Sequence, residues 1–89
     1  MKREKIKIFG RVQGVFFRHF TKKEAKKLDL KGWCRNELDD TVLIVVEGEE
    51  TKLKNFIEWC RKGPPMANVE KVEVEEEKYI GDEGEFEIR

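Results

Sequence analysis

The chain has 89 residues, of which 38% are hydrophobic, so we expect a single domain over residues 1–89 with no room for a second. Charged residues make up 43% of the chain and balance to a formal net charge of zero. No segment approaches the ~20 apolar residues of a membrane span, and the N-terminus lacks the apolar stretch of a signal peptide. We therefore expect a cytoplasmic protein that does not bind membranes.

The charge is distributed unevenly along the chain. Residues 1–31 hold eleven Lys and Arg against three Asp and Glu, whereas residues 32–89 hold eight against sixteen. A positive first third is suited to concentrating an anionic ligand there. The asymmetry is equally explained by attraction between the two parts of the chain across the fold, and the sequence leaves both explanations open.

The first third predicts a strand, a glycine-containing loop and a helix. Residues 5–9 alternate polar and apolar, which is the period of a half-buried strand, and two glycines within residues 10–14 interrupt that pattern. Apolar residues then recur at helical spacing. The helix starts either at a capping box formed by Thr21 and Glu24 or near Phe17, and we favour Phe17 because a phosphate site needs free amides facing the loop.

The rest of the chain predicts further strands and a second helix. This helix opens at Glu49-Glu50-Thr51, with acidic residues where the helix dipole favours them, and ends at residues 63–65. It carries one apolar stripe: Leu53, Phe56, Ile57 and Cys60. Strands are expected at residues 33–38, 42–46 and 69–74, a short one at 86–88, and a tight turn at Asp39–Asp40. This order predicts an α+β, ferredoxin-like βαββαβ sandwich, in which two helices cover one face of a mainly antiparallel sheet with a short fifth strand.

The loop at residues 10–18 is the best candidate site. Gly10 and Gly14 allow several N–H groups to point at one anion, and such a nest at a helix N-terminus binds phosphate. Arg18, in the first helical turn, can bind two phosphate oxygens. Taken alone, the loop fits an ordinary turn with a surface arginine better. It is not a nucleotide P-loop, because that motif ends in Gly-Lys-Ser/Thr.

The sequence suggests no metal site. Cys34 and Cys60 are too few and too far apart for a zinc cluster, and we expect both to be reduced, buried and unpaired. The chain has one histidine, His19, which we place on the helix surface.

Nucleic-acid binding is also disfavoured. RNA-recognition domains display aromatic residues on their two central strands, and residues 42–46 supply none. We expect the aromatic side chains near the loop to pack in the core rather than stack on bases: Phe16, Phe17 and Phe20. The lysines of the first helix are expected to be solvated, with weak substrate steering as the alternative: Lys22, Lys23, Lys26 and Lys27.

Two longer stretches together resemble the signatures of the acylphosphatase family. The first is Gly10-Arg11-Val12-Gln13-Gly14-Val15-Phe16-Phe17-Arg18, and the second is Gly32-Trp33-Cys34-Arg35-Asn36, followed by Asp39-Asp40-Thr41-Val42 and Glu47-Gly48. The likeness continues through residues 63–65 and 69–74 to Phe86-Glu87-Ile88-Arg89, and so covers essentially the full chain.

The resemblance implies a monomeric enzyme that hydrolyses small-molecule acyl phosphates without metal or cofactor. By match to the signatures, Arg18 would hold the phosphoryl group and Asn36 would orient the attacking water. The backbone amides of the loop would cradle the phosphate oxygens: Gln13, Gly14, Val15, Phe16 and Phe17. A competing possibility is a non-catalytic, anion-binding module of the kind that serves a larger carbamoyl-phosphate enzyme.

One position departs from the family pattern. Asp40 stands in the turn where the family usually has glycine. Because Asp tolerates left-handed turn geometry, we expect a slightly strained hairpin and an intact site.

Overall fold

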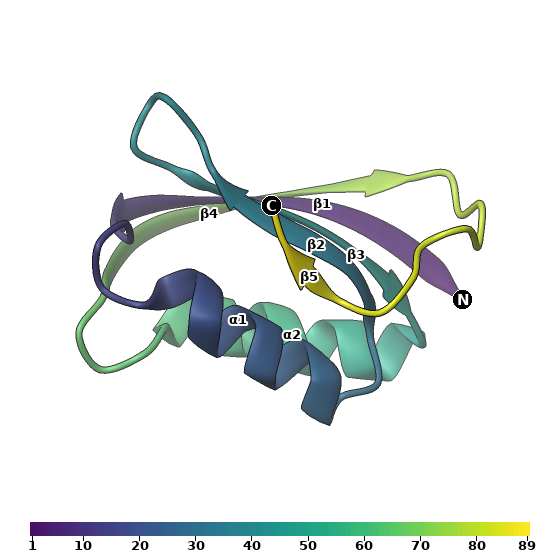
Figure 1. Cartoon of the computed structure of the whole chain (residues 1–89). Helices are drawn as coiled ribbons and strands as arrows, with labels where there is room; N and C mark the ends of the chain where they lie inside the picture. The colour runs from purple at the N-terminus through teal and green to yellow at the C-terminus, as the bar shows by residue number, and fades with distance from the viewer.

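Both helices of the protein pack on the same face of a five-stranded sheet (Figure 1), and the computed structural model describes residues 1–89. Neither helix is long and apolar enough to cross a membrane. The elements in chain order are β1 (Lys2–Arg11), α1 (Phe17–Lys27), β2 (Lys31–Asn36), β3 (Val42–Gly48), α2 (Glu50–Lys62), β4 (Asn68–Glu77) and β5 (Glu87–Ile88).

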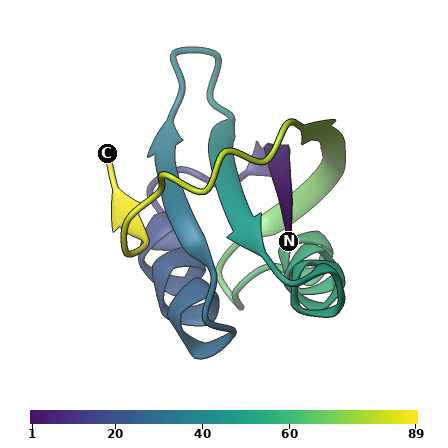
Figure 2. The same ribbon diagram turned by 90° about the vertical axis from the view of Figure 1, so that its right-hand side faces the viewer.

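The strands lie in the order β4-β1-β3-β2-β5. All neighbours are antiparallel except β2 and β5, which are parallel. Since β4 and β5 form opposite edges, the segment between them crosses one end of the sheet, as Figure 2 shows. The predicted ferredoxin-like α+β fold, with both helices on one face and a short fifth strand, is confirmed.

The core lies between the sheet and the helices. In β1 the residues with even numbers face the helices, and Ile6 and Ile8 are fully buried there. The register places Ile44 of β3 opposite both Ile6 of β1 and Cys34 of β2, so three buried side chains form one row. Residues with odd numbers point to the other face of the sheet, which is covered by charged side chains such as Lys7.

The first helix begins at Phe17, as predicted for a phosphate site. Thr21 is buried inside the helix, and its hydroxyl donates to the carbonyl oxygen of Phe17 at 2.8 Å. The alternative prediction, that the helix starts at a capping box formed by Thr21 and Glu24, is therefore wrong. The stripe on α2 is confirmed: Leu53, Phe56 and Cys60 are buried, and Ile57 is half-buried.

The strands β1, β3 and β4 are each longer than predicted, and two further boundaries differ in ways that affect the site. The second strand runs from Lys31 to Asn36 instead of over residues 33–38, because the Glu37 amide turns to donate to the Thr41 carbonyl and closes the hairpin. Asn36 is therefore the last residue of β2. Phe86 lies in the core rather than in β5, which holds only Glu87 and Ile88.

The three phenylalanines around the loop have different environments. Phe17 is buried, as predicted, whereas Phe20 is only half-buried. The prediction is wrong for Phe16, whose side chain is 74% exposed. Phe16 precedes the first helical residue and adopts a left-handed conformation (φ 61°), so the helical period does not set its direction.

Candidate active site

The loop between β1 and α1 presents a series of free backbone donors. The N–H groups of residues 13–19 donate to no acceptor in the protein, and the first backbone bond into the helix is Phe20 N–H to Phe16 O at 3.1 Å. No side chain caps the helix, and its first turn contains no acidic residue. These donors, at the positive end of a helix, suit an anion.

The two glycines serve different purposes. Gly14 has φ +74° with open space where a side chain would lie, so it is needed for the loop conformation. A Cβ on Gly10 would collide with the Asn68 carbonyl oxygen of β4, so Gly10 permits a close strand approach. Of the two, only Gly14 shapes the candidate site itself.

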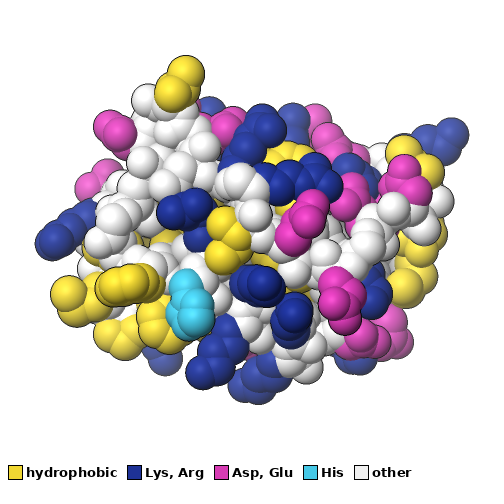
Figure 3. Space-filling view, in the orientation of Figure 1, with side chains coloured by type: hydrophobic (Ala, Val, Ile, Leu, Met, Phe, Trp, Pro, Cys, Tyr) yellow, Lys and Arg dark blue, Asp and Glu magenta, His cyan; other side chains and the backbone are white.

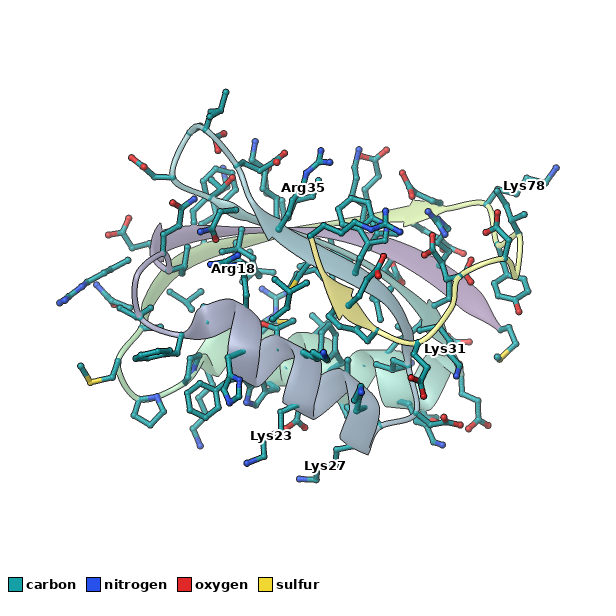
Figure 4. All side chains as sticks on the ribbon, in the orientation of Figure 1. Arg18, Lys23, Lys27, Lys31, Arg35 and Lys78 are labelled. Atoms are coloured by element: carbon teal, nitrogen blue, oxygen red, sulfur yellow. The ribbon has the colours of Figure 1, made fainter.

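Arg18 reaches from the first turn of α1 toward the sheet. Figure 4 shows its side chain rising to the sheet, while Lys23 and Lys27 point away from it. The Arg18 side chain is half-buried and forms no ion pair. A guanidinium without a carboxylate is free to bind an anionic ligand in a bidentate manner.

Asn36 lies on the same side of the sheet as Arg18. It follows Cys34 by two residues, so both side chains face the helices, and the Cys34 thiol donates to the Arg18 carbonyl oxygen at 3.9 Å. The Asn36 Oδ1 atom is buried and has no hydrogen-bond partner. Because an unpaired buried acceptor costs about 1–3 kcal/mol, this oxygen is poised to accept a bond from a bound molecule.

The side chain of Gln13 connects the loop to the residues that follow Asn36. Its Nε2 group donates to the carbonyl oxygens of Glu37 and Thr41, each at 2.9 Å. The sequence places only the backbone amide of Gln13 in the phosphate-binding loop and does not predict this side-chain contact. No local pattern could have revealed it, since the partners lie 24 and 28 residues away.

The hairpin between β2 and β3 is held by Asp39. Its carboxylate accepts bonds from the Thr41 amide and hydroxyl, and it pairs with the Lys7 ammonium at 2.9 Å. The Thr41 hydroxyl, followed by Lys7, lowers the pKa of Asp39 to about 2. Asp40 has φ 70°, so it adopts the left-handed geometry expected where the family has glycine.

Ion pairing across the fold accounts for part of the charge asymmetry. The cations of β1 pair with acidic residues from later in the chain, among them Lys2 with Glu76 and Lys5 with Glu75. In contrast, no lysine of α1 forms an ion pair: Lys22, Lys23, Lys26 and Lys27. These lysines are left without a carboxylate partner, and the steering of an anionic ligand by them stays an expectation.

The thiols do not contribute a nucleophile. Cys34 and Cys60 are buried and free, as expected, and burial raises the pKa of Cys34 to about 12. Burial likewise raises the pKa of Cys60. His19 is exposed on α1, as expected. No three His, Cys, Asp or Glu side chains come together in a way that could hold a metal ion.

Among the surface pockets, two on opposite faces of the sheet bear on the choice of site. The pocket beside the loop has a volume of about 290 Å³ and includes Gly14, Arg18 and Ile88 in its lining. A larger hollow of about 660 Å³ lies on the opposite face, between Lys5 and Glu75, and includes no loop residue. We place the site at the smaller pocket, because the free amides and the unpaired arginine are there.

Known proteins match this chain over its full length. The acylphosphatase family model covers residues 4–88. The chain belongs to the acylphosphatase family. An acylphosphatase from Rubrobacter xylanophilus is 48% identical over 88 residues, which are 99% of this chain and 80% of that protein. The chain accordingly has the function of an acylphosphatase, which is a hydrolase.

Solved structures of acylphosphatases have the same fold. The crystal structure of acylphosphatase from Bacillus subtilis superposes with a TM-score of 0.96 at 38% identity, covering 100% of this chain and 99% of that one. Full-length HypF, in its phosphate- and nucleotide-bound form, superposes with a TM-score of 0.91 at 34% identity. That match covers 99% of this chain but 12% of HypF, so the fold also occurs within a much larger protein.

Proposed function

We propose that the protein hydrolyses the carboxyl–phosphate bond of small acyl phosphates, giving a carboxylate and inorganic phosphate, without a metal or cofactor. Arg18 and the amides of residues 13–17 hold the phosphoryl group, and Asn36 positions the attacking water. The observation that carries this assignment is the buried, unpartnered Oδ1 of Asn36, on the hairpin to which the loop with its free amides is bonded through Gln13.

The loop and Arg18 supply the charge stabilisation that phosphoryl transfer needs. In the transition state, negative charge is spread over three equatorial oxygens, and donors fixed in advance stabilise that charge without reorganisation. The free N–H groups and the unpaired guanidinium are such donors. They perform the part that a metal ion performs in many other phosphoryl-transfer sites.

Asn36 is suited to orient water but not to deprotonate it. Its side-chain amide is neutral, and its Oδ1 can accept one hydrogen of a water molecule held in line with the phosphorus atom. A carboxylate is already a good leaving group, so no strong general acid is needed. The proton of the water passes to an oxygen of the substrate's own phosphoryl group.

A metal-free hydrolysis assay tests the activity. Acetyl phosphate and benzoyl phosphate are incubated with the protein in the presence of a chelator, and release of phosphate is followed. We expect turnover that added Mg²⁺ does not raise. If neither substrate is cleaved at any pH, or if the chelator abolishes cleavage, the proposed function is wrong.

Replacing Arg18 should weaken both binding and catalysis. We expect Arg18→Ala to raise the inhibition constant of inorganic phosphate and to lower kcat, each charge-assisted hydrogen bond being worth about 1.5–3 kcal/mol. The matched control is Lys23→Ala, which removes an unpaired cation from the same helix that points away from the sheet. Equal effects of the two substitutions would exclude a specific role for Arg18.

Replacing Asn36 should separate binding from turnover. We expect Asn36→Ala to lower kcat by about 10²-fold or more, in the range found when one oriented group is removed from a site. The inhibition constant of phosphate should stay near that of the natural sequence, because the loop and Arg18 are untouched. An Asn36→Ala protein with full activity contradicts the assignment.

A second candidate function is an anion-binding module without turnover. The similarity to a segment of HypF shows that this fold occurs within a much larger protein. Phosphate-dependent NMR shifts of the amides of residues 13–19, together with no hydrolysis of either substrate, would favour the module. We prefer the enzyme because a purely anion-binding site has no use for the unpartnered Oδ1 of Asn36.

Three properties of the whole protein stay predictions from the sequence: a monomer, a cytoplasmic location and no binding to nucleic acid. Sedimentation of the pure protein tests the first. An electrophoretic shift assay with RNA tests the third.

A further inference from the structure

The pocket beside Arg18 has apolar walls that phosphate binding does not explain. Its volume of about 290 Å³ is close to the lower end, about 300 Å³, of sites for small organic ligands. A phosphoryl group presents only oxygen atoms to its surroundings. The Phe16 and Ile88 side chains that line this pocket therefore have no role in holding the phosphoryl group, and the His19 ring lies in the same lining.

These three side chains are accessible from solvent. Phe16 is 74% exposed, Ile88 is 39% exposed, and His19 is exposed on the first turn of α1. The His19 ring packs edge-on against Phe20, with 5.2 Å between the ring centroids, which fixes its position on the helix. Figure 3 shows the histidine between hydrophobic side chains on one side and basic side chains on the other.

The backbone at Phe16 adds to this observation. A left-handed conformation is costly for a large side chain and much less so for Gly or Asn. The chain nevertheless places a phenylalanine there and leaves it exposed at the pocket. Strained backbone conformations cluster at ligand-binding sites, so the Phe16 ring is a candidate ligand contact.

The direction of the reaction places the acyl group in this pocket. In phosphoryl transfer the attacking and leaving oxygens lie roughly in line on opposite sides of the phosphorus atom. Water held by Asn36 therefore drives the leaving carboxylate away from Asn36. Arg18 lines the pocket whereas Asn36 does not, and Phe16 and His19 come from the loop and α1 rather than from β2.

We propose that Phe16, His19 and Ile88 form a subsite for the acyl group, which makes the enzyme select acyl phosphates with an aromatic or large apolar acyl group. This inference rests on the proposed function. The ring faces of Phe16 and His19 stack on a flat acyl group, and Ile88 covers its edge. A short acyl group such as acetyl reaches none of these side chains in full.

The test compares two substrates in each variant. The ratio of kcat/KM for benzoyl phosphate to kcat/KM for acetyl phosphate is measured, so that the intrinsic reactivity of the substrates cancels between variants. We expect Ile88→Ala and His19→Ala each to lower this ratio by about 3- to 10-fold, as expected for loss of part of an apolar contact. The inhibition constant of inorganic phosphate should stay unchanged in both.

Ile80→Ala is the matched control, because Ile80 is a 66% exposed isoleucine outside the pocket. Its ratio should equal that of the natural sequence. Circular dichroism melts establish that each variant is folded, and His19→Ala, on a helix surface, serves if Ile88→Ala does not fold.

An unchanged ratio in His19→Ala and Ile88→Ala, or an equal fall in Ile80→Ala, would overturn the subsite while leaving the hydrolase intact. Failure of the natural protein to cleave either substrate would instead overturn the proposed function on which the subsite rests.

Discussion

Three kinds of polar group around the start of α1 lack a partner within the protein. They are the amides of residues 13–19, the guanidinium of Arg18 and the Oδ1 atom of Asn36. By contrast, Arg3 of β1 bonds to three carboxylates. The buried Asn36 Oδ1 atom raises the free energy of the unliganded protein, whereas exposed donors of the loop are hydrated. In the proposed mechanism, a bound phosphoryl group and its water pair with all three kinds of group at once. Departures from the local rules of folding are expected at such a site.

At the same scale, Asp39 should make the hairpin sensitive to acid. Its pKa is about 2 in the folded protein, below the ordinary value of 3.8, so the charged form favours folding. The contribution is complete above about pH 4 and is lost as the pH falls toward 2. We expect Asp39→Asn to lower the urea midpoint at pH 7 and to flatten its dependence on pH between 4 and 2.

The control for this experiment is Asp40→Asn. The Asp40 side chain is exposed and forms no ion pair. The backbone φ of 70° at this position is tolerated by Asn as well as by Asp, so the substitution introduces no new strain. Its urea midpoints should follow those of the natural sequence at each pH. A steep fall between pH 4 and 2 that persists in Asp39→Asn would show that another carboxylate is responsible.

At the scale of elements, the site depends on joining two units that are distant in the sequence. One unit is β1, the loop and α1, which carries Arg18; the other is the β2–β3 hairpin, which carries Asn36. The side chain of Gln13 joins them through two hydrogen bonds of 2.9 Å. In the proposed mechanism, this amide partly sets the distance between the phosphoryl group and the water, and a shift of about 1 Å between reacting groups can cost 10²-fold in rate.

Gln13→Ala should lower kcat more than it weakens phosphate binding. The loop amides and Arg18 remain, but the hairpin loses two bonds to Gln13, each with a net value of about 0.5–1.5 kcal/mol. Gln13→Glu should be at least as damaging, because a carboxylate cannot donate to the Glu37 and Thr41 carbonyls. Faster hydrogen exchange of residues 37–41 should accompany the loss. Unchanged kcat in both variants would show that the contact does not position Asn36.

At the scale of the whole molecule, Arg3 ties the C-terminal part of the chain to the sheet. Its guanidinium bonds to Glu47 of β3, Glu77 of β4 and Glu83 of the segment that crosses the sheet, each at 3.1 Å. The Gly81 amide of the same segment donates to Glu47 at 3.4 Å. This segment leads into Phe86 of the core and into β5, whose Ile88 lines the pocket. The ion cluster thus fixes one wall of the site from a distance.

Arg3→Met should destabilise the protein strongly. The Glu47 side chain is 4% exposed, and removing one partner of a buried ion pair costs about 3–5 kcal/mol. Lys5→Met is the control, since Lys5 lies on the same face of β1 but is 40% exposed, and its pairs are worth about 0–1 kcal/mol. The free energies of unfolding are measured in urea at pH 7. Similar losses for both substitutions would contradict the special role of Arg3.

The sequence by itself determined the elements and the fold class, and it indicated the loop where the site is proposed. Alternation in β1, the stripe on α2 and the glycines of the loop are local patterns, and a local pattern depends only on neighbouring residues and on one buried face. The two signature-like stretches indicated the acylphosphatase family, and this resemblance suggested the roles proposed for Arg18 and Asn36. The predicted end of β2 was wrong, because the hydrogen bond from the Glu37 amide to the Thr41 carbonyl ends the strand two residues earlier than predicted.

Only the tertiary structure decided which polar groups are paired and which are free. The contacts of Gln13, the pairing of the β1 cations, the exposure of Phe16 and the unpartnered oxygen of Asn36 all depend on residues distant in sequence. A side chain's partner is set by how helices and strands pack, and no periodicity along the chain encodes that. The loop identified from sequence could bind an anion; packing placed Asn36 on the face of the sheet that the Arg18 helix covers.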